Sequence, residues 1–171
     1  LARGGSKRLK NKNIKKLKNI PLINWTINVA IKSKKFCNII VSSDSEKILK
    51  TIKIDDNKIL ILKRPKEYAY DKSTSEDAIL HALKWYEKKF SKIDYITLLQ
   101  PTSPFRSLRT INRGLKEIAN SKTNAVIAVQ RIKSQLSDKR SFYVTKNNLC
   151  KEMKSSSTSN KLYKISGLFY L

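Results

Sequence analysis

The chain has 171 residues, of which 40% are hydrophobic and 29% are charged, and these proportions indicate a folded domain with one core and exclude a disordered segment. Lys and Arg (37 residues) outnumber Asp and Glu (13 residues), giving a formal net charge of +24 that attracts any polyanion. The basic residues are spread along the whole chain, which is typical of solvated lysine-rich faces; a basic nucleic-acid-binding module is the alternative.

The residues that most often build metal or disulfide sites are scarce. The two cysteines, Cys37 and Cys150, lie far apart in no metal-ligand spacing, which favours a reducing compartment. The single histidine, His81, lies inside a helical pattern, where a structural role is commoner than a ligand role. No apolar run approaches the roughly 18 residues of a membrane span, and no signal peptide opens the chain. We therefore expect a cytoplasmic protein without a membrane partner.

Helical and strand patterns alternate along the chain. In chain order they predict a helix over 21–36, a strand over 38–43, a helix from 44 or 45 to 52, a strand over 59–62, a helix over 73–89, strands over 95–99 and 125–129 with a helix over 108–120 between them, and a strand at 168–171. This alternation predicts a single α/β domain over residues 1–171, with three layers around a mainly parallel sheet.

The two ends and one internal segment depart from this pattern. The chain opens directly in a glycine-rich loop and stops inside a strand pattern, so we expect it to be truncated at both ends. Residues 131–162 are rich in Ser, Lys and Asn, with one β-like stretch at 142–144. They are expected to lie outside the main sheet, as a flexible excursion or a small hairpin used for dimerisation.

Ligands of α/β sheets bind at the carboxyl ends of the strands. The informative residues are therefore those that follow strands: Ser43-Asp44, Arg64, the segment 100–103 and the opening loop. In that loop, Arg3-Gly4-Gly5-Ser6-Lys7 can bring backbone N–H groups and cationic side chains close to a polyphosphate. The loop matches neither common nucleotide-binding fingerprint, and a basic surface loop is the other interpretation.

Five segments in the same order resemble the motifs of CMP-sialic acid synthetases, a cytidylyltransferase family. The opening loop with Lys12-Asn13 resembles the family's first motif, and 40–44 resembles its Val-Ser-Thr-Asp strand end. Arg64-Pro65 followed by 71–75, then Leu98-Leu99-Gln100-Pro101-Thr102-Ser103-Pro104-Phe105-Arg106, and finally Ser166-Gly167-Leu168-Phe169-Tyr170-Leu171 continue the series, with Ser166 where the family has Asn. The resemblance implies a fold like that of nucleotide-diphospho-sugar transferases, which is Rossmann-like.

The resemblance also implies site residues. Arg3 and Lys12 would grip phosphate oxygens during catalysis, and Gln100, Arg106 and Lys164 would serve the sugar substrate. The residues expected to bind the nucleotide are Arg3, Ser6, Lys12, Asn13, Arg64, Ser73 and Ser75.

The implied reaction joins CMP from CTP to an acidic nine-carbon sugar and releases pyrophosphate. Pseudaminic acid or an eight-carbon keto-sugar acid are alternative acceptors. The resemblance further implies a homodimer and an Mg²⁺ cofactor in the complete protein. No metal ligand is expected within this chain, because the family's metal-binding aspartates lie beyond residue 171, and the chain alone is expected to turn over poorly.

Overall fold

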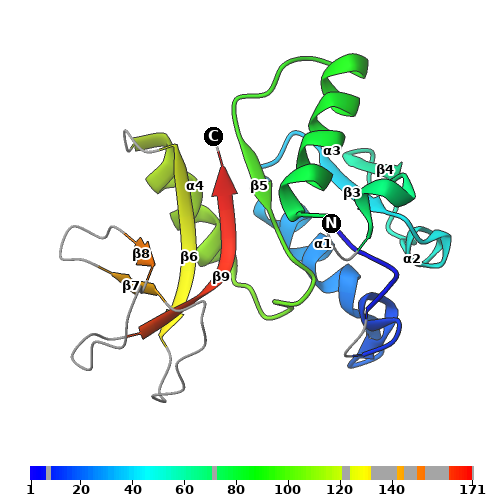
Figure 1. Ribbon diagram of the computed structural model, residues 1–171, viewed down its shortest axis with the longest axis horizontal. Helices are drawn as coiled ribbons and strands as arrows, with labels where there is room; N and C mark the ends of the chain where they lie inside the picture. Colours follow the sequence, from blue (N-terminus) through cyan, green and yellow to red (C-terminus); the bar gives the residue numbers. More distant parts are fainter. Residues whose placement is uncertain are drawn as a thin grey trace.

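The computed structural model describes residues 1–6, 9–70, 73–120, 124–131, 142–144, 150–152 and 162–170, with side chains described as far as residue 129. Figure 1 shows two groups of strands with helices around them and the N-terminus between β3 and β5. The elements are the 3-10 helices η1 (Lys12–Ile14) and η2 (Lys66–Tyr68), the helices α1 (Leu22–Ser33), α2 (Glu46–Lys50), α3 (Ser75–Lys89) and α4 (Leu108–Asn120), and the strands β1 (Lys16–Leu17), β2 (Ile20–Pro21), β3 (Ile39–Ser43), β4 (Ile59–Lys63), β5 (Ile96–Leu98), β6 (Ala125–Arg131), β7 (Phe142–Val144), β8 (Cys150–Glu152) and β9 (Leu162–Tyr170).

A two-residue hairpin connects the opening loop to α1. Strands β1 and β2 are antiparallel, and Leu17 pairs with Ile20. Between them, Lys18 (φ 47°) and Asn19 (φ 64°) both adopt the left-handed conformation that a type I′ turn requires. The indole N–H of Trp25 donates to the Leu17 carbonyl at 3.1 Å, so the hairpin is fixed to the first turns of α1.

Strands β3 and β4 form a parallel pair joined through the short helix α2. Their register aligns Ile39 with Ile59 and Ser43 with Lys63. Parallel strands cannot be connected by a tight turn, and α2 supplies the crossover. Ser42 and Ser43 at the end of β3 have no exposed surface, so the carboxyl end of this strand lies inside the protein, beside the opening loop.

Helix α3 begins with a capping box, which explains its start at Ser75. The Thr74 hydroxyl accepts the Asp77 N–H at 3.1 Å, and the Asp77 carboxylate accepts the Thr74 N–H at 2.8 Å. At the other end of the helix, the Tyr86 hydroxyl donates to Asn38 Oδ1 at 2.7 Å. This bond ties the last turns of α3 to the residue that precedes β3.

The remaining strands form a five-stranded sheet around β9. Both β5 and β6 pair with β9 in the antiparallel sense, and Tyr170 is the partner of Ile96 on one side and of Ala125 on the other. Strand β7 pairs with the start of β9 and with β8, also antiparallel. The order is therefore β5-β9-β7-β8, with β6 beside β9.

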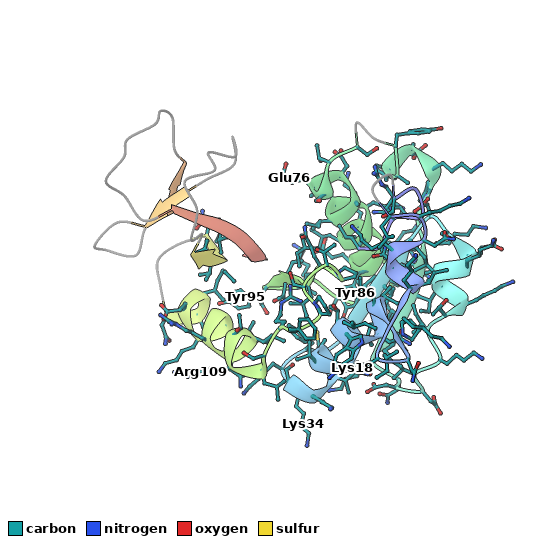
Figure 2. The ribbon with its side chains drawn as sticks, turned by 90° about the horizontal axis from the view of Figure 1, so that it is seen from below. Lys18, Lys34, Glu76, Tyr86, Tyr95 and Arg109 are labelled. Carbon is teal, nitrogen blue, oxygen red and sulfur yellow. The ribbon has the colours of Figure 1, made fainter. Side chains whose placement is uncertain are left out.

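Helices cover the strands from two sides. Figure 2 shows α3 on one side of the β3 region and α1 on the other, and α1 also packs against α4. The main core cluster contains Ala2, Ile23, Ile27, Val41 and Ile48. None of the helices in the described part of the chain is long and apolar enough to span a membrane.

The α/β fold class and the positions of the predicted helices and main strands are confirmed, while the described strands are divided among more than one sheet. Among the strands that the structure describes, β3 and β4 are the one hydrogen-bonded parallel pair, β5 and β6 run in the same direction because both are antiparallel to β9, and β3 and β5 belong to separate sheets. Strand β9 lies antiparallel between β5 and β6. The sequence of a short apolar strand does not indicate in which direction the strand will run.

The expectation for residues 131–162 is wrong in one respect. The stretch at 142–144 is confirmed as β7, but β7 and β8 join the five-stranded sheet through β9 and do not lie outside it. Strand β8 carries Lys151 and Glu152, and its short polar sequence gave no signal of a strand. The rest of the segment falls outside the described residues.

Candidate functional site

The opening loop is held against the end of β3 by its backbone. The Ala2 N–H donates to the Ser42 carbonyl at 3.0 Å, and the Gly4 N–H donates to Asp44 Oδ1 at 3.0 Å. The Ser6 N–H then folds back onto the Gly4 carbonyl at 2.9 Å. The chain therefore runs along β3 and turns sharply just past its carboxyl end, where an α/β sheet binds ligands.

Gly4 lies where no side chain fits. A Cβ atom built on Gly4 would lie 2.9 Å from Cβ of Ser45 and 3.4 Å from a carboxylate oxygen of Asp44. A Cβ atom on the neighbouring Gly5 would meet nothing within 4 Å. Gly4 is thus required for the close approach of the loop to the segment after β3, whereas Gly5 faces open space.

A buried arginine lies beside this contact. Arg64 is only 5% exposed, its N–H donates to the Ser43 carbonyl at 2.8 Å, and its Nη2 lies 3.6 Å from Asp44 Oδ1. Burial lowers the pKa of Arg64 from its ordinary value, the nearby Asp44 carboxylate opposes this shift, and the Arg3 charge adds to it. Asp44 therefore joins the N–H of the glycine loop to a buried cation.

Two nitrogen atoms of the Arg64 guanidinium lack hydrogen-bond acceptors among the described residues. Nε and Nη2 are buried, yet neither finds a hydrogen-bond acceptor among the side chains and backbone groups that the structure describes. A buried cationic N–H without an acceptor is costly, and an anionic oxygen satisfies it better than any neutral group. This arrangement favours an anionic ligand at the end of β3.

Arg3 links the loop to the segment before α3. Its carbonyl accepts the side-chain amide of Asn13 at 3.0 Å, and its Nη1 lies 3.5 Å from the Tyr70 carbonyl. The Tyr70 carbonyl also accepts the Ser73 N–H at 3.0 Å, and the Ser73 hydroxyl donates to the Glu67 carbonyl at 2.7 Å. Asn13 is buried and holds the Arg3 backbone in place.

The structure thus brings four of the expected nucleotide residues into one connected cluster, namely Arg3, Asn13, Arg64 and Ser73. Lys12 precedes Asn13 in η1 and is partly buried, as is Ser6 in the loop. Ser75 is exposed and opens α3 directly after the capping Thr74. We call the cluster Arg3, Gly4, Asn13, Asp44, Arg64 and Ser73 the loop site.

The segment after β5 forms a compact turn of its own. Its Gln100 carbonyl accepts the Ser103 N–H at 3.2 Å, and the Ser103 carbonyl accepts the Arg106 N–H at 3.3 Å. Gln100 is exposed, whereas Arg106 is partly buried, and burial lowers its pKa. Lys164 lies in β9 opposite Gln130, and its side chain is outside the description. It remains a prediction that the side chains of Gln100, Arg106 and Lys164 lie beside the loop site.

Comparison with known proteins decides the family. A family profile described as "Cytidylyltransferase" matches residues 1–167, almost the whole chain. The chain belongs to this cytidylyltransferase family. Its relatives include an N-acylneuraminate cytidylyltransferase of Escherichia coli O18:K1:H7, 39% identical over 134 residues, which are 76% of this chain and 30% of that protein. The chain therefore spans less than a third of that relative.

Two further likenesses cover nearly all of the chain. CMP-N,N'-diacetyllegionaminic acid synthase of Legionella pneumophila is 32% identical over 174 residues, covering 99% of this chain and 74% of the relative. A solved structure of CMP:2-keto-3-deoxy-manno-octonic acid synthetase complexed with CTP aligns with a TM-score of 0.74 at 14% identity, covering 99% of this chain and 70% of that one. This second likeness confirms the nucleotide-diphospho-sugar transferase-like fold class.

Side chains that could ligate a metal ion are sparse in the described part of this cytidylyltransferase chain. Mg²⁺ takes oxygen ligands in near-octahedral geometry, and no group of three metal-ligating side chains occurs among the residues with described positions. The one carboxylate of the loop site, Asp44, already accepts the Gly4 N–H beside the Arg64 cation. No step of the reaction is therefore assigned to a metal ion, and Mg²⁺ in the complete protein remains a prediction.

The sequence pointed less clearly to two parts of the loop site. Asp44 stood out as a residue after a strand, but its bond to Gly4 depends on a contact across 40 positions that no local pattern shows. The carbonyls of Glu67 and Tyr70, which hold Ser73 and Arg3, belong to the backbone, and backbone acceptors have no signature in residue type.

Proposed function

We propose that this chain carries the CTP-binding part of a cytidylyltransferase that transfers CMP from CTP to an acidic nine-carbon sugar. The observation that carries the proposal is the loop site, where Asp44 fixes the glycine loop beside a buried arginine with N–H groups available to an anion. The names of the relatives, an N-acylneuraminate cytidylyltransferase and a CMP-N,N'-diacetyllegionaminic acid synthase, support an acceptor of the sialic acid type.

In this reaction the anomeric hydroxyl oxygen of the sugar attacks the α-phosphorus of CTP. An oxygen–phosphorus bond forms, the α–β anhydride bond breaks, the hydroxyl proton is lost to solvent or a base, and pyrophosphate leaves. The chemistry depends mainly on orientation and on dispersing charge. Arg3 and Arg64 supply fixed positive charge beside the phosphates, and Lys12 would reach the phosphate oxygens from η1.

The acceptor would be recognised outside the loop site. Gln100 follows β5 and is exposed, so its amide is available to a sugar hydroxyl or carboxylate. Arg106 holds the turn that presents Gln100 through its own N–H bond to Ser103. An acceptor of the pseudaminic or eight-carbon type would need the same carboxylate recognition, and a substrate panel distinguishes the three.

Titration calorimetry with CTP tests the proposal. Arg64→Met keeps much of the side-chain volume and removes the charge, and the exposed Arg109 (Figure 2), changed to Met, is the matched control on α4. We expect Arg64→Met to weaken CTP binding at least tenfold, because a charge-assisted hydrogen bond contributes about 1.5–3 kcal/mol, and Arg109→Met to bind as the parent does. Equal loss in both variants, or tighter binding of single-stranded nucleic acid with a steep salt dependence, would contradict it.

The proposed protein works as a homodimer through the β7–β8 hairpin. Strand β8 lies at the end of the strand order, and no other described strand pairs with its outer edge. An exposed strand edge pairs readily with a second chain. Light scattering should give twice the chain mass, and replacing Lys151 in β8 with Pro, which is incompatible with regular strand pairing, should halve that mass. A monomeric parent chain contradicts this part of the proposal.

A further inference from the structure

An exposed aromatic ring lies in the turn that follows β5 and presents Gln100. This ring is Phe105, which is 76% exposed, the largest exposed fraction among the large hydrophobic residues that the structure describes. A ring so exposed gains little from burial. It lies instead against Trp25 of α1, with the two ring centroids 6.1 Å apart and the ring planes at 65°. This T-shaped arrangement is one of the favourable geometries of an aromatic pair.

Trp25 is fixed from its other side by the β1–β2 hairpin. Its indole N–H donates to the Leu17 carbonyl at 3.1 Å, and its side chain is partly buried. The N–H of Leu22, at the start of the same helix, donates to the Lys15 carbonyl at 2.9 Å. Two bonds to the backbone before α1 therefore hold this end of the helix, and Trp25 offers Phe105 a stationary surface.

The same backbone leads to the loop site. The Lys15 N–H donates to the Lys12 carbonyl at 3.2 Å, which closes η1. Within η1, the side-chain amide of Asn13 donates to the Arg3 carbonyl at 3.0 Å, and η1 also contacts α1. A continuous series of contacts therefore runs from Arg3 through η1, the hairpin and Trp25 to the turn that presents Gln100.

The turn depends on such a contact for its place in the molecule. The Ser103 N–H donates to the Gln100 carbonyl, the Arg106 N–H donates to the Ser103 carbonyl, and Pro101 is buried at the start of the turn. Bonds between near neighbours fix the shape of a turn but not its distance from another helix. The contact of Phe105 with Trp25 joins residues far apart in the sequence, so it acts on that distance.

We propose that Trp25 and Phe105 are a positioning pair, whose contact holds the turn that presents Gln100 at a fixed place relative to the loop site. The inference rests on the proposed function, which assigns the loop site to CTP and Gln100 to the acceptor. Attack on the α-phosphorus requires the two reactants in one geometry, and a displacement of about 1 Å can cost about a hundredfold in rate. The two rings act through Gln100 and touch neither reactant.

A second tryptophan–phenylalanine pair supplies the matched control. Phe90 is 54% exposed and lies against Trp85 with centroids 6.3 Å apart and ring planes at 67°, almost the same geometry. Phe90 follows α3 and precedes β5, whereas the turn follows β5, so the two pairs lie towards opposite ends of this strand. Removing the Phe90 ring therefore removes an equivalent contact without affecting the turn.

Hydrogen exchange of the ligand-free chain tests the positioning directly. Because Phe105 is exposed, Phe105→Ala should leave the fold intact and speed exchange of the Ser103 and Arg106 amides by about threefold to tenfold, the range that one aromatic pair contributes. Phe90→Ala should exchange at these amides as the parent does, and Phe105→Tyr, which keeps the ring, should restore the parent rate. Unchanged exchange in Phe105→Ala overturns the proposal.

A double-mutant cycle separates the pair from local effects of either substitution. Trp25→Leu leaves the sequence of the turn intact and should speed the same two amides, because Phe105 loses its partner. Trp25→Leu combined with Phe105→Ala should add little to either single change, since both remove one contact. Fully additive effects would show that the two rings act independently and would overturn the proposal.

Ligand titration distinguishes a positioning role from a merely structural one. In calorimetry, Phe105→Ala should bind CTP as the parent does, but the CTP-saturated variant should bind N-acetylneuraminic acid about threefold to tenfold more weakly, with Phe105→Tyr restoring the parent value. Equal weakening of both ligands refutes the positioning role. A parent chain that does not bind CTP refutes the proposed function instead, and the exchange rates of the ligand-free chain then still decide whether Trp25 holds the turn.

Discussion

The backbone N–H of Gly4 donates to the carboxylate of Asp44 at 3.0 Å, across 40 residues of sequence. The same carboxylate oxygen lies 3.6 Å from the guanidinium of Arg64. One side chain therefore sets the position of the loop and compensates the charge of the buried arginine. Because Asp44 follows β3 and Arg64 follows β4, the parallel pairing of these two strands is what brings the charges together.

Replacing Asp44 separates its two roles. Asp44→Asn keeps an acceptor oxygen for the Gly4 N–H and removes the negative charge, whereas Asp44→Ala removes both. We expect urea denaturation to show both variants less stable by about 2 kcal/mol, because Arg64 loses its partner. CTP affinity should fall about tenfold in Asp44→Ala, for the loss of one positioning bond, and stay near the parent value in Asp44→Asn. Equal affinities in the two variants would show that the bond to Gly4 does not position the loop.

The two glycines of the loop make a matched pair. In Gly4→Ala the new methyl group would lie 2.9 Å from Cβ of Ser45, so the loop must move away from the end of β3. In Gly5→Ala the methyl group meets open space. We expect Gly4→Ala to destabilise the chain by about 1–3 kcal/mol and to weaken CTP binding, and Gly5→Ala to change neither by much. Calorimetric melting and CTP titration of both variants measure this, and a stronger effect at Gly5 would contradict it.

The sequence alone predicted the helices and the strands β3, β4 and β6 well, because the apolar residues of each element recur in the pattern of a buried helix face or a buried strand. Helix α3 is an example, since Thr74 and Asp77 mark its start and the apolar stripe through Ala78 and Ala82 marks its inner face. What failed was the pairing of strands. The apolar run at 168–171 reads the same whether β9 runs parallel or antiparallel to its neighbours.

The loop site was predictable only in part. Arg3 stood out as a cation of the glycine loop, and Arg64 as a cation that follows a strand. Their connection through Asp44 is a product of the β3–β4 register, and Tyr70 takes part only through its carbonyl. The separation of β3 from β5 into two sheets is likewise not visible in the local sequence of either strand.

The capping box of α3 predicts a loss of stability in acid. Hydrogen bonds from the Thr74 backbone and hydroxyl lower the pKa of Asp77 below its ordinary value of 3.8. A carboxyl group with a depressed folded pKa stabilises the fold above the unfolded pKa, and this contribution disappears as the pH falls below about 4. Thr74→Ala removes the cap and should lower the melting temperature at pH 7 by about 2–4 °C. In the variant, less stability should be lost between pH 5 and pH 3, within a window of about two units; an unchanged acid profile would count against the capping box.

The Leu1 amino group predicts a second pH dependence, which comes from a group that is charged when it is protonated. Its pKa is lowered from 8.0 to about 6 in the folded chain, mainly by burial. Between these values the unfolded chain binds more protons than the folded chain, so stability rises with pH from about 6 to 8, by on the order of 2 kcal/mol. Below about pH 6 the penalty is present in full, and above about pH 8 it has vanished because both states are neutral. N-acetylation of Leu1 removes the charge and is the matched control, since every other titrating group stays the same. Urea denaturation of both forms across this range should show a slope in the free chain that the acetylated chain lacks. Parallel profiles would mean that the Leu1 amino group is solvated in the folded chain.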